Sequence, residues 1–278
     1  MGGLLRVACC QVAPVVGDLT GNLVAAQHAV RATAARGASV IVLPELVTSG
    51  YCFESPQEAR SVALTTDSDE LAELADAAPE SVLVLGYAEL GGDGQLYNSA
   101  VVFDRGHLVA EYRKVHLWDR EQLVFRSGSA PPPVCDTSAG RIGVLVCYDL
   151  EFPEMTRSIA LRGAELLAVP TNWPWVDRPE GAEAPEVVIA MAAARVNRMA
   201  IACCDRSGTE RGQAWTEASA VSGPDGWIRA RVDSTGCAVA DLDPADSRLK
   251  RISARNDVLA DRRPDVYACE PGYPPTGG

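Results

Sequence analysis

The segment RIGVLVCYDLEFPE, residues Arg141–Glu154, decides the fold class of this chain. An apolar run of strand length ends at Cys147, and proline and acidic residues follow, as helix N-termini favour. A cysteine at such a turn is lifted out of the carboxyl edge of a sheet, beside backbone N–H groups that can face an oxyanion. The segment therefore predicts an α/β fold and a candidate nucleophile. A buried core cysteine is the alternative interpretation.

Strand-like and helix-like segments alternate on both sides of this stretch, which favours an α/β layer fold. The expected helices are Leu23–Ala35, Asp69–Ala77, Pro153–Arg162 and Pro185–Arg198. The expected strands are Leu5–Gln11, Val40–Leu43, Ser81–Glu89, Ser99–Phe103, Ile142–Val146, Leu166–Val169, Ala200–Cys204, Ser219–Val221 and Cys237–Asp241. Glycine-containing turns at Gly91–Gln95 and Gly223–Trp227 predict two hairpins, so part of the sheet is expected to be antiparallel.

Length and composition are typical of one globular domain. The chain has 278 residues, of which 47% are hydrophobic and 22% charged, enough to build a large core. We expect a single domain over residues 1–270 and a Pro/Gly-rich tail over residues 271–278. A proline-rich stretch, Ser127–Val134, is expected to be a loop.

Charge and cysteine usage restrict the partners. The formal net charge of -12 opposes binding to nucleic acid and to anionic membrane surfaces. The apolar run at the N-terminus is too short for a signal peptide, and no segment reaches the ~18 apolar residues of a membrane span. Nine cysteines include no Cys-x-x-Cys pair, so buried thiols are favoured over zinc ligands or disulfides. We therefore expect a cytoplasmic protein.

A second candidate site residue lies in SVIVLPELVTSGY, residues Ser39–Tyr51. Glu45 follows an apolar strand in a segment that is otherwise free of charge from Ala38 to Phe53. Desolvation there would raise the pKa of the carboxyl toward the range of a general base. A carboxylate that only accepts backbone N–H groups is the competing interpretation.

The third candidate is Lys114 in VAEYRKVHLWDREQLVF, residues Val109–Phe125. The chain has 25 basic residues, and only Lys114 and Lys250 are lysines. A compact ammonium approaches a reacting oxygen as a point charge, which the planar guanidinium of arginine cannot do. Chance placement is the alternative. Glu45, Lys114 and Cys147 each end an apolar strand, so they are expected to converge at one sheet edge.

These motifs resemble those of a known family. Glu45 in LPE, Lys114 in YRKVHL and Cys147 in GVLVCYDLEFPE are similar to the Glu-Lys-Cys triad of the nitrilase superfamily, the carbon–nitrogen hydrolases. The resemblance implies a four-layer α-β-β-α sandwich that associates through its outer helices into homodimers or larger homo-oligomers. It also implies thiol catalysis without a metal or other cofactor. One departure is Val196, which stands where many members carry a glutamate and removes one expected ion pair.

The resemblance also implies roles. Glu45 would be the base, Lys114 and the backbone N–H of Tyr148 would hold the oxyanion, and Glu121 matches the family's second glutamate. The motifs are closest to the amidase branch, which predicts hydrolysis of a small aliphatic amide to an acid and ammonia. The residues expected to contact substrate are Tyr51, Trp118, Glu151, Asn172 and Trp173, with Trp175 in the same group of loops.

Other functions stay open. N-carbamoyl amine or amino acid hydrolysis and nitrile hydrolysis would use the same groups, and a non-catalytic binding protein on this fold is a different class. A papain-like arrangement would instead pair Cys147 with His116, which we expect to stabilise the lysine loop.

Overall fold

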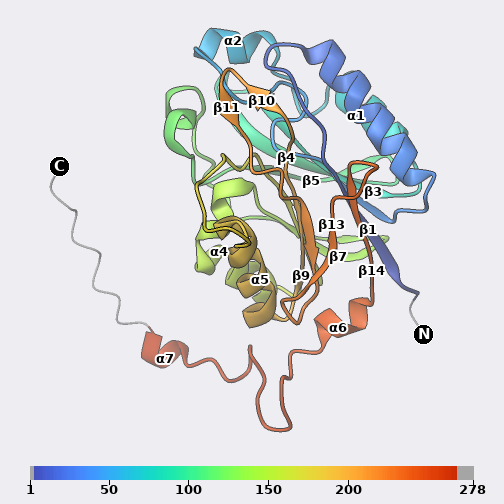
Figure 1. The fold of residues 1–278 in the computed structure, drawn as a ribbon, viewed down its shortest axis with the longest axis vertical. Coiled ribbons are helices and arrows are strands. Elements are labelled where there is room, and N and C mark those ends of the chain that lie inside the picture. The colour runs from blue at the N-terminus through green and yellow to red at the C-terminus, as the bar shows by residue number, and fades with distance from the viewer. Residues whose placement is uncertain (1–2, 268–278) are drawn as a thin grey trace, which may run out of the picture.

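The strands of the protein form two six-stranded sheets (Figure 1) in a computed structural model that describes residues 3–267. The first sheet has the order β14-β1-β2-β3-β4-β5 and the second the order β13-β12-β9-β8-β7-β6. The first sheet comprises β1 Leu5–Cys10, β2 Val40–Val42, β3 Val82–Leu90, β4 Leu96–Asp104, β5 His107–Arg113 and β14 Cys237–Leu242. The second comprises β6 Val134–Thr137, β7 Gly140–Val144, β8 Leu166–Pro170, β9 Ala200–Cys204, β12 Ala220–Ser222 and β13 Ile228–Arg231.

Each sheet combines parallel strands with antiparallel hairpins. β1, β2 and β3 are parallel, as are β7, β8 and β9. The two predicted hairpin turns join β3 to β4 and β12 to β13, both antiparallel, so both predictions are confirmed. A small extra hairpin of β10 Thr209–Glu210 and β11 Gln213–Ala214 projects at one end of the molecule (Figure 1).

The longer helices cover the outer faces of the two sheets. The helices of residues 3–267 are α1 Leu19–Ala34, α2 Pro56–Ser61, α3 Asp69–Asp76, α4 Pro153–Leu161, α5 Pro185–Asn197, α6 Pro244–Arg248 and α7 Pro264–Tyr267, with 3-10 turns η1 Asp119–Leu123 and η2 Cys147–Glu151. α1 contacts β1 and β2, whereas α5 contacts β9 and β12, and the two sheets contact each other through pairs such as β1 with β9. The predicted four-layer α-β-β-α sandwich is therefore confirmed.

Alternating side chains of the central strands serve two different layers. In β1, Val7 and Cys9 pack in the core between the sheets, while Ala8 and Cys10 pack under α1 and α3. Strands buried on both faces read as continuous apolar runs, which is why the sequence shows no clean alternation there.

The element boundaries differ from the expectations at several places. α1 begins earlier than predicted because Asp18 accepts a hydrogen bond from the Gly21 amide and caps the helix. The predicted proline-rich loop ends in a short strand, since β6 begins at Val134. Val196, the departure from the family pattern, is an exposed residue of α5.

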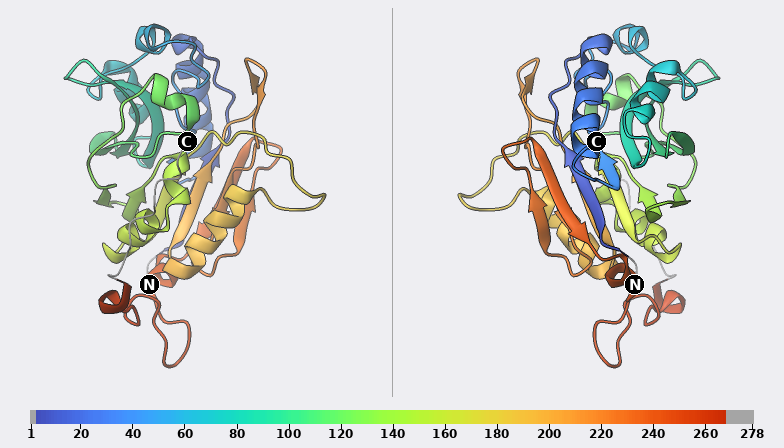
Figure 2. Two further views of the ribbon diagram at one scale, coloured as in Figure 1. Left: turned by 90° about the vertical axis from the view of Figure 1, so that its left-hand side faces the viewer. Right: turned by 90° about the vertical axis from the view of Figure 1, so that its right-hand side faces the viewer.

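The segment after α6 extends away from the body of the molecule (Figure 2). The predicted tail, residues 271–278, and the last residues of the predicted domain lie outside the described residues, so that boundary stays a prediction. Within residues 3–267, no helix has the length and apolarity to cross a membrane.

Candidate active site

Glu45 lies in a fully buried turn directly after β2. The turn sits against Gly86 of β3, where an added Cβ would meet the Glu45 Cα at 2.6 Å. The Gly86 amide donates to the Pro44 carbonyl at 3.2 Å, and the Gly86 carbonyl accepts from Val47 at 2.9 Å. A glycine is required in β3 because any side chain would push the turn out of the site.

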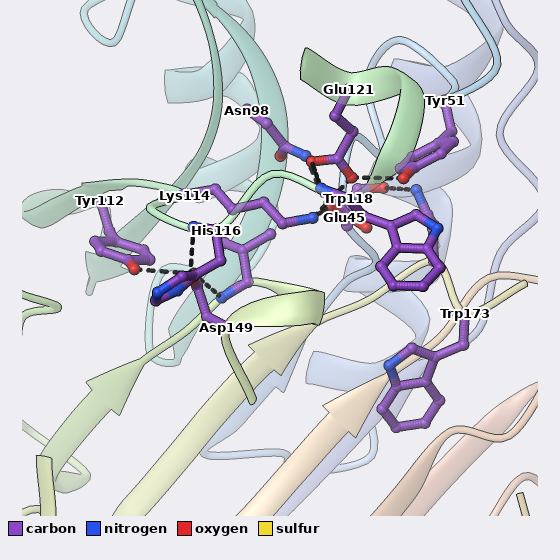
Figure 3. A network of polar contacts seen from close by, with 12 residues as sticks. Glu45, Tyr51, Asn98, Tyr112, Lys114, His116, Trp118, Glu121, Asp149 and Trp173 are labelled. Carbon is purple, nitrogen blue, oxygen red and sulfur yellow. Dashed lines mark hydrogen bonds and ion pairs between the residues drawn. The ribbon is translucent and has the colours of Figure 1, made fainter. Parts of the chain in front are cut away.

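The carboxylate of Glu45 has one oxygen in use and one without a partner. Its Oε1 accepts hydrogen bonds from Lys114 Nζ and from Asn98 Nδ2, both at 2.7 Å (Figure 3). Its Oε2 is buried and has no partner among the residues of the described chain, 3–267. Burial raises the pKa of Glu45 to about 7, although Lys114 opposes this shift. The group is therefore suited to exchange a proton near neutral pH.

Lys114 follows β5 and is completely buried between two carboxylates. Its Nζ donates to Glu45 Oε1 and to Glu121 Oε1, each at 2.7 Å (Figure 3). Burial opposes the positive charge, but Glu121 and Glu45 outweigh it and keep the pKa of Lys114 above its usual range. The ammonium stays charged, and neighbouring Arg113 points elsewhere, to Glu89.

Glu121 is placed by the turn η1 and by Tyr51. The Tyr51 hydroxyl donates to Glu121 Oε1 at 2.5 Å, and the Trp118 amide donates to Oε2 at 3.2 Å. The Tyr51 hydroxyl therefore helps to position Glu121 beside Lys114. The predicted contact of Tyr51 with substrate stays a prediction.

Cys147 begins the turn η2 after β7 and has a positive φ of 46°. A non-glycine residue in this region is strained, and such strain is concentrated at functional turns. Burial and the charge of Glu45 raise the pKa of the Cys147 thiol well above its usual range, while Lys114 and the Asn172 amide lower it. The thiol therefore needs a base. The first backbone N–H groups of a helical turn, here including that of Tyr148, have no carbonyl acceptor within the turn, so they can donate to an oxyanion.

Asp149 ties the cysteine turn to the lysine loop. Its Oδ1 lies 2.8 Å from Nδ1 of His116 and accepts the His116 amide at 3.0 Å. Its Oδ2 accepts the Tyr112 hydroxyl at 2.9 Å (Figure 3). The ring of His116 also stacks on Phe152 at 3.6 Å. His116 therefore supports the loop, as the sequence suggested, and its Nδ1 is engaged with Asp149.

A small cavity opens directly beside Cys147. Residues from three loops and from α5 line it: Trp118, Cys147, Tyr148, Leu150, Glu151, Trp173, Pro174, Glu186 and Ile189. Of the predicted substrate-contacting residues, Trp118, Glu151 and Trp173 are therefore brought to the cysteine. Trp175 does not line the cavity, and Arg178 lies over its ring at 4.4 Å.

Asn172 faces the base rather than open space. Its Nδ2 donates to the backbone carbonyl of Glu45 at 2.9 Å, and its amide group is buried. This contact fixes the turn that carries Glu45. A contact of Asn172 with substrate stays a prediction.

Three buried polar residues of the site were missed from the sequence: Asn98, Asp149 and Asp205. Asn98 lies in β4 and orients Glu45, and its one signal was a polar residue inside an apolar strand. Asp205 follows β9 and accepts the amides of Trp173 and Ala218, which holds the loop at the cavity. Their partners are far away in the sequence, so only the fold reveals them.

The family resemblance implies that Lys114 holds an oxyanion, and on that role Lys114→Arg is expected to lower kcat about 10²–10³-fold, as for loss of an oxyanion donor. Because the side chain is fully buried, the larger guanidinium should also destabilise the fold by ~1–3 kcal/mol. Steady-state kinetics and thermal melts measure both effects. The matched control is Lys250→Arg, since Lys250 only caps α5 by donating to the Asn197 and Arg198 carbonyls. Full activity of Lys114→Arg would contradict this role for Lys114.

The chain matches known proteins along nearly its whole length. The family model described as Carbon-nitrogen hydrolase matches residues 6–251. A nitrilase from Pyrococcus abyssi is 33% identical over 271 residues, which cover 95% of this chain and 99% of that protein. The structure of an amidase from Nesterenkonia sp. is similar with a TM-score of 0.78 and 29% identity, covering 96% of each chain. A variant of the amidase from Nesterenkonia sp. AN1, with the same TM-score and identity over 96% of this chain and 97% of that one, was solved in complex with butyramide. The chain therefore belongs to the carbon–nitrogen hydrolase family of the nitrilase superfamily and is a hydrolase of carbon–nitrogen bonds.

Proposed function

We propose that this chain hydrolyses small aliphatic amides to a carboxylic acid and ammonia through a thioester on Cys147. One observation carries the proposal: the buried carboxylate of Glu45, which has an oxygen without a partner, lies near enough to Cys147 that its charge raises the pKa of the thiol. Cys147 is on a strained turn, and the buried ammonium of Lys114 lies beside them. The butyramide complex of the similar amidase supports an aliphatic amide as the substrate class.

The mechanism follows from the groups in the site. Glu45 takes the proton of the Cys147 thiol, and the sulfur attacks the amide carbonyl. Lys114 and the backbone N–H of Tyr148 stabilise the oxyanion, which typically contributes several kcal/mol in a dry site. Glu45 then returns the proton to the departing nitrogen, and ammonia leaves. Water, deprotonated by Glu45, attacks the thioester, and the acid is released as the thiol is regenerated.

A substrate screen tests the reaction class. The purified full chain is incubated with small amides, nitriles and N-carbamoyl amines, and the products are identified. We expect ammonia and the matching acid from butyramide-sized amides, with no carbon dioxide. Faster turnover of carbamoyl compounds with release of carbon dioxide would assign the chain to that alternative. Failure to turn over any compound, with no acyl adduct in the intact mass, would favour a binding protein.

The pH profile reports on the proposed base. Below about pH 7 Glu45 is protonated and cannot accept the thiol proton, so kcat/KM should rise with pH through about 7. The measurement is kcat/KM for an uncharged amide across the pH range. An acid limb near the ordinary glutamate value would show that the base is a solvated carboxylate.

The charge of the cavity predicts a substrate preference. Glu151 and Glu186 both line the space beside Cys147, and burial together with Glu186 raises the pKa of Glu151. A distal carboxylate on the substrate would meet like charge, whereas an ammonium would be attracted. We expect kcat/KM to fall in the order ammonium, neutral, carboxylate for amides of equal length, by roughly two- to fivefold per step, as for partly exposed charges.

A matched variant checks this order. Glu151→Gln should reduce the ratio of the rates for ammonium and carboxylate amides, while Glu154→Gln, on the next helix turn and outside the cavity, should not. A carboxylate amide as the best substrate would contradict the preference and leave the amide chemistry intact.

Association into a homo-oligomer and a cytoplasmic location also belong to this proposal as predictions from the sequence.

A further inference from the structure

A second cavity, remote from the proposed catalytic residues, has two thiols in its lining. It measures about 690 Å³ and lies between α1 and the end of the β1–β14 strand pair. Cys10 and Cys237 line it together with His28, Thr33 and Arg36 of α1. None of Glu45, Lys114, Glu121 and Cys147 lines it, so the two thiols, which are buried at the wall of this cavity, lie outside the proposed catalytic site.

The strand register places the two cysteines directly opposite each other. β1 and β14 are antiparallel, with Cys10 paired to Cys237 and both packed on the α1 side. The Gln11 amide donates to the Gly236 carbonyl at 2.9 Å, while the Cys237 carbonyl accepts from Asp233 instead. In an antiparallel ladder, hydrogen-bonded residue pairs alternate with non-hydrogen-bonded ones, here called open pairs. The hydrogen bond between the residues that flank them shows that Cys10 and Cys237 form an open pair.

An open pair brings its side chains closest. Its Cα atoms are typically about 4.5 Å apart, inside the range of roughly 4.4–6.8 Å that disulfides need. The two thiols also share one partner: Thr33 Oγ1 lies 3.1 Å from Cys10 Sγ and 3.7 Å from Cys237 Sγ. A disulfide therefore requires rotation of two side chains and no rearrangement of the sheet.

The environment also favours ionisation of one thiol. A hydrogen bond with Cys10 holds the pKa of the Cys237 thiol below its usual range, and Thr33 and Arg36 act in the same direction. The thiolate is the form of cysteine that attacks peroxides and disulfides. Cys237 is thus suited to be the attacking thiol and Cys10 the resolving one.

We propose that Cys10 and Cys237 form a redox-active dithiol that a hydroperoxide converts into a cross-strand disulfide. The Cys237 thiolate attacks the terminal peroxide oxygen, which gives a sulfenic acid and, after proton transfer, water or an alcohol. The Cys10 thiol attacks the sulfenic sulfur, the disulfide forms, and water leaves. Two thiols lose two protons and two electrons, and the peroxide bond takes them up. The disulfide would join β1 and β14, strands from the two ends of the chain, and should therefore stabilise the fold.

The protein contains its own negative control. Cys9 and Cys204 form another close pair, in which burial and then the hydrogen bond with Cys9 raise the pKa of the Cys204 thiol. Both lie in the core between the two sheets and neither lines the cavity under α1. Because neither thiol reaches the cavity under α1, this pair should stay reduced.

Peptide mapping tests the proposal on the full chain carrying Cys147→Ala, which removes the proposed nucleophile from the reaction. The protein is treated with hydrogen peroxide, alkylated under denaturing conditions and digested. We expect a linked Cys10–Cys237 peptide, its reversal by dithiothreitol, and a melting temperature that is several degrees higher in the oxidised form. Separate alkylation of both cysteines after peroxide would overturn the proposal. So would a linked Cys9–Cys204 peptide in its place, or a Cys237 sulfinic acid with no link.

Discussion

Replacing Cys147 by alanine is expected to remove amide hydrolysis, with a loss of about 10⁴-fold or more in kcat, as for other nucleophiles of covalent catalysis. The thiol supplies the only bond that the proposed reaction makes to the protein, so no neighbouring group can replace it. Butyramide binding, measured by calorimetry, should persist because the cavity walls are supplied by other residues. Alanine keeps the Cβ, so the backbone strain at this position, where φ is 46°, should be unchanged.

Two controls make this result specific. Intact mass spectrometry after mixing with a reactive amide or ester should show an acyl adduct on the unmodified chain and none on Cys147→Ala. Cys135→Ala, at a half-buried position of the edge strand β6, should keep both the adduct and the rate. Ammonia release at an undiminished rate from Cys147→Ala would exclude the thioester route.

The second large effect is expected for Glu45→Gln, with a loss of about 10³-fold in kcat/KM, within the usual range for a positioned acid–base group. Glutamine has nearly the shape of glutamate but cannot accept the thiol proton. Because burial raises the pKa of Cys147 well above its usual range, the thiol would then stay protonated at neutral pH. The limb of the pH profile near 7 should disappear together with the activity.

Glu89→Gln is the matched control for a buried carboxylate. Glu89 lies on β3 and binds Arg113 and Ser99, outside the cavity beside Cys147. Its replacement should lower the melting temperature and leave the pH profile in place. If Glu45→Gln retained the acid limb and most of the rate, another group would have to be the base, with His116 as the first alternative to test.

Local sequence determined the type of most elements. The central strands of both sheets are buried on both faces, so they appear as unbroken apolar runs, and glycine turns marked the two hairpins. The short helices α2 and α6 were not among the expected elements, because a few residues give too weak a periodic signal. The strands β5 and β13 were not given bounds, since exposed and charged residues interrupt their apolar pattern. The pairing of the two sheets came from the family resemblance rather than from the pattern.

The candidate triad could be proposed from the sequence because each member lies at or just after the end of a strand. For Glu45 the strand is apolar, and a charge next to apolar surface is unfavourable unless the fold provides partners, so the sequence alone marks the residue. The supporting residues show no such conflict. Asn98 and Asp149 are ordinary polar residues until the fold places Asn98 against Glu45 and Asp149 against His116.

The sequence by itself determined that Lys114 was unusual, since one of only two lysines in the chain sits beside an arginine. Only the tertiary structure decided why: Lys114 is completely buried at 2.7 Å from two carboxylates that come from other segments. The same holds for Cys10 and Cys237, which are separated by nearly the whole chain and meet only through strand register. Residue types depend on local chemistry, whereas partners depend on contacts between distant segments, which no local pattern encodes.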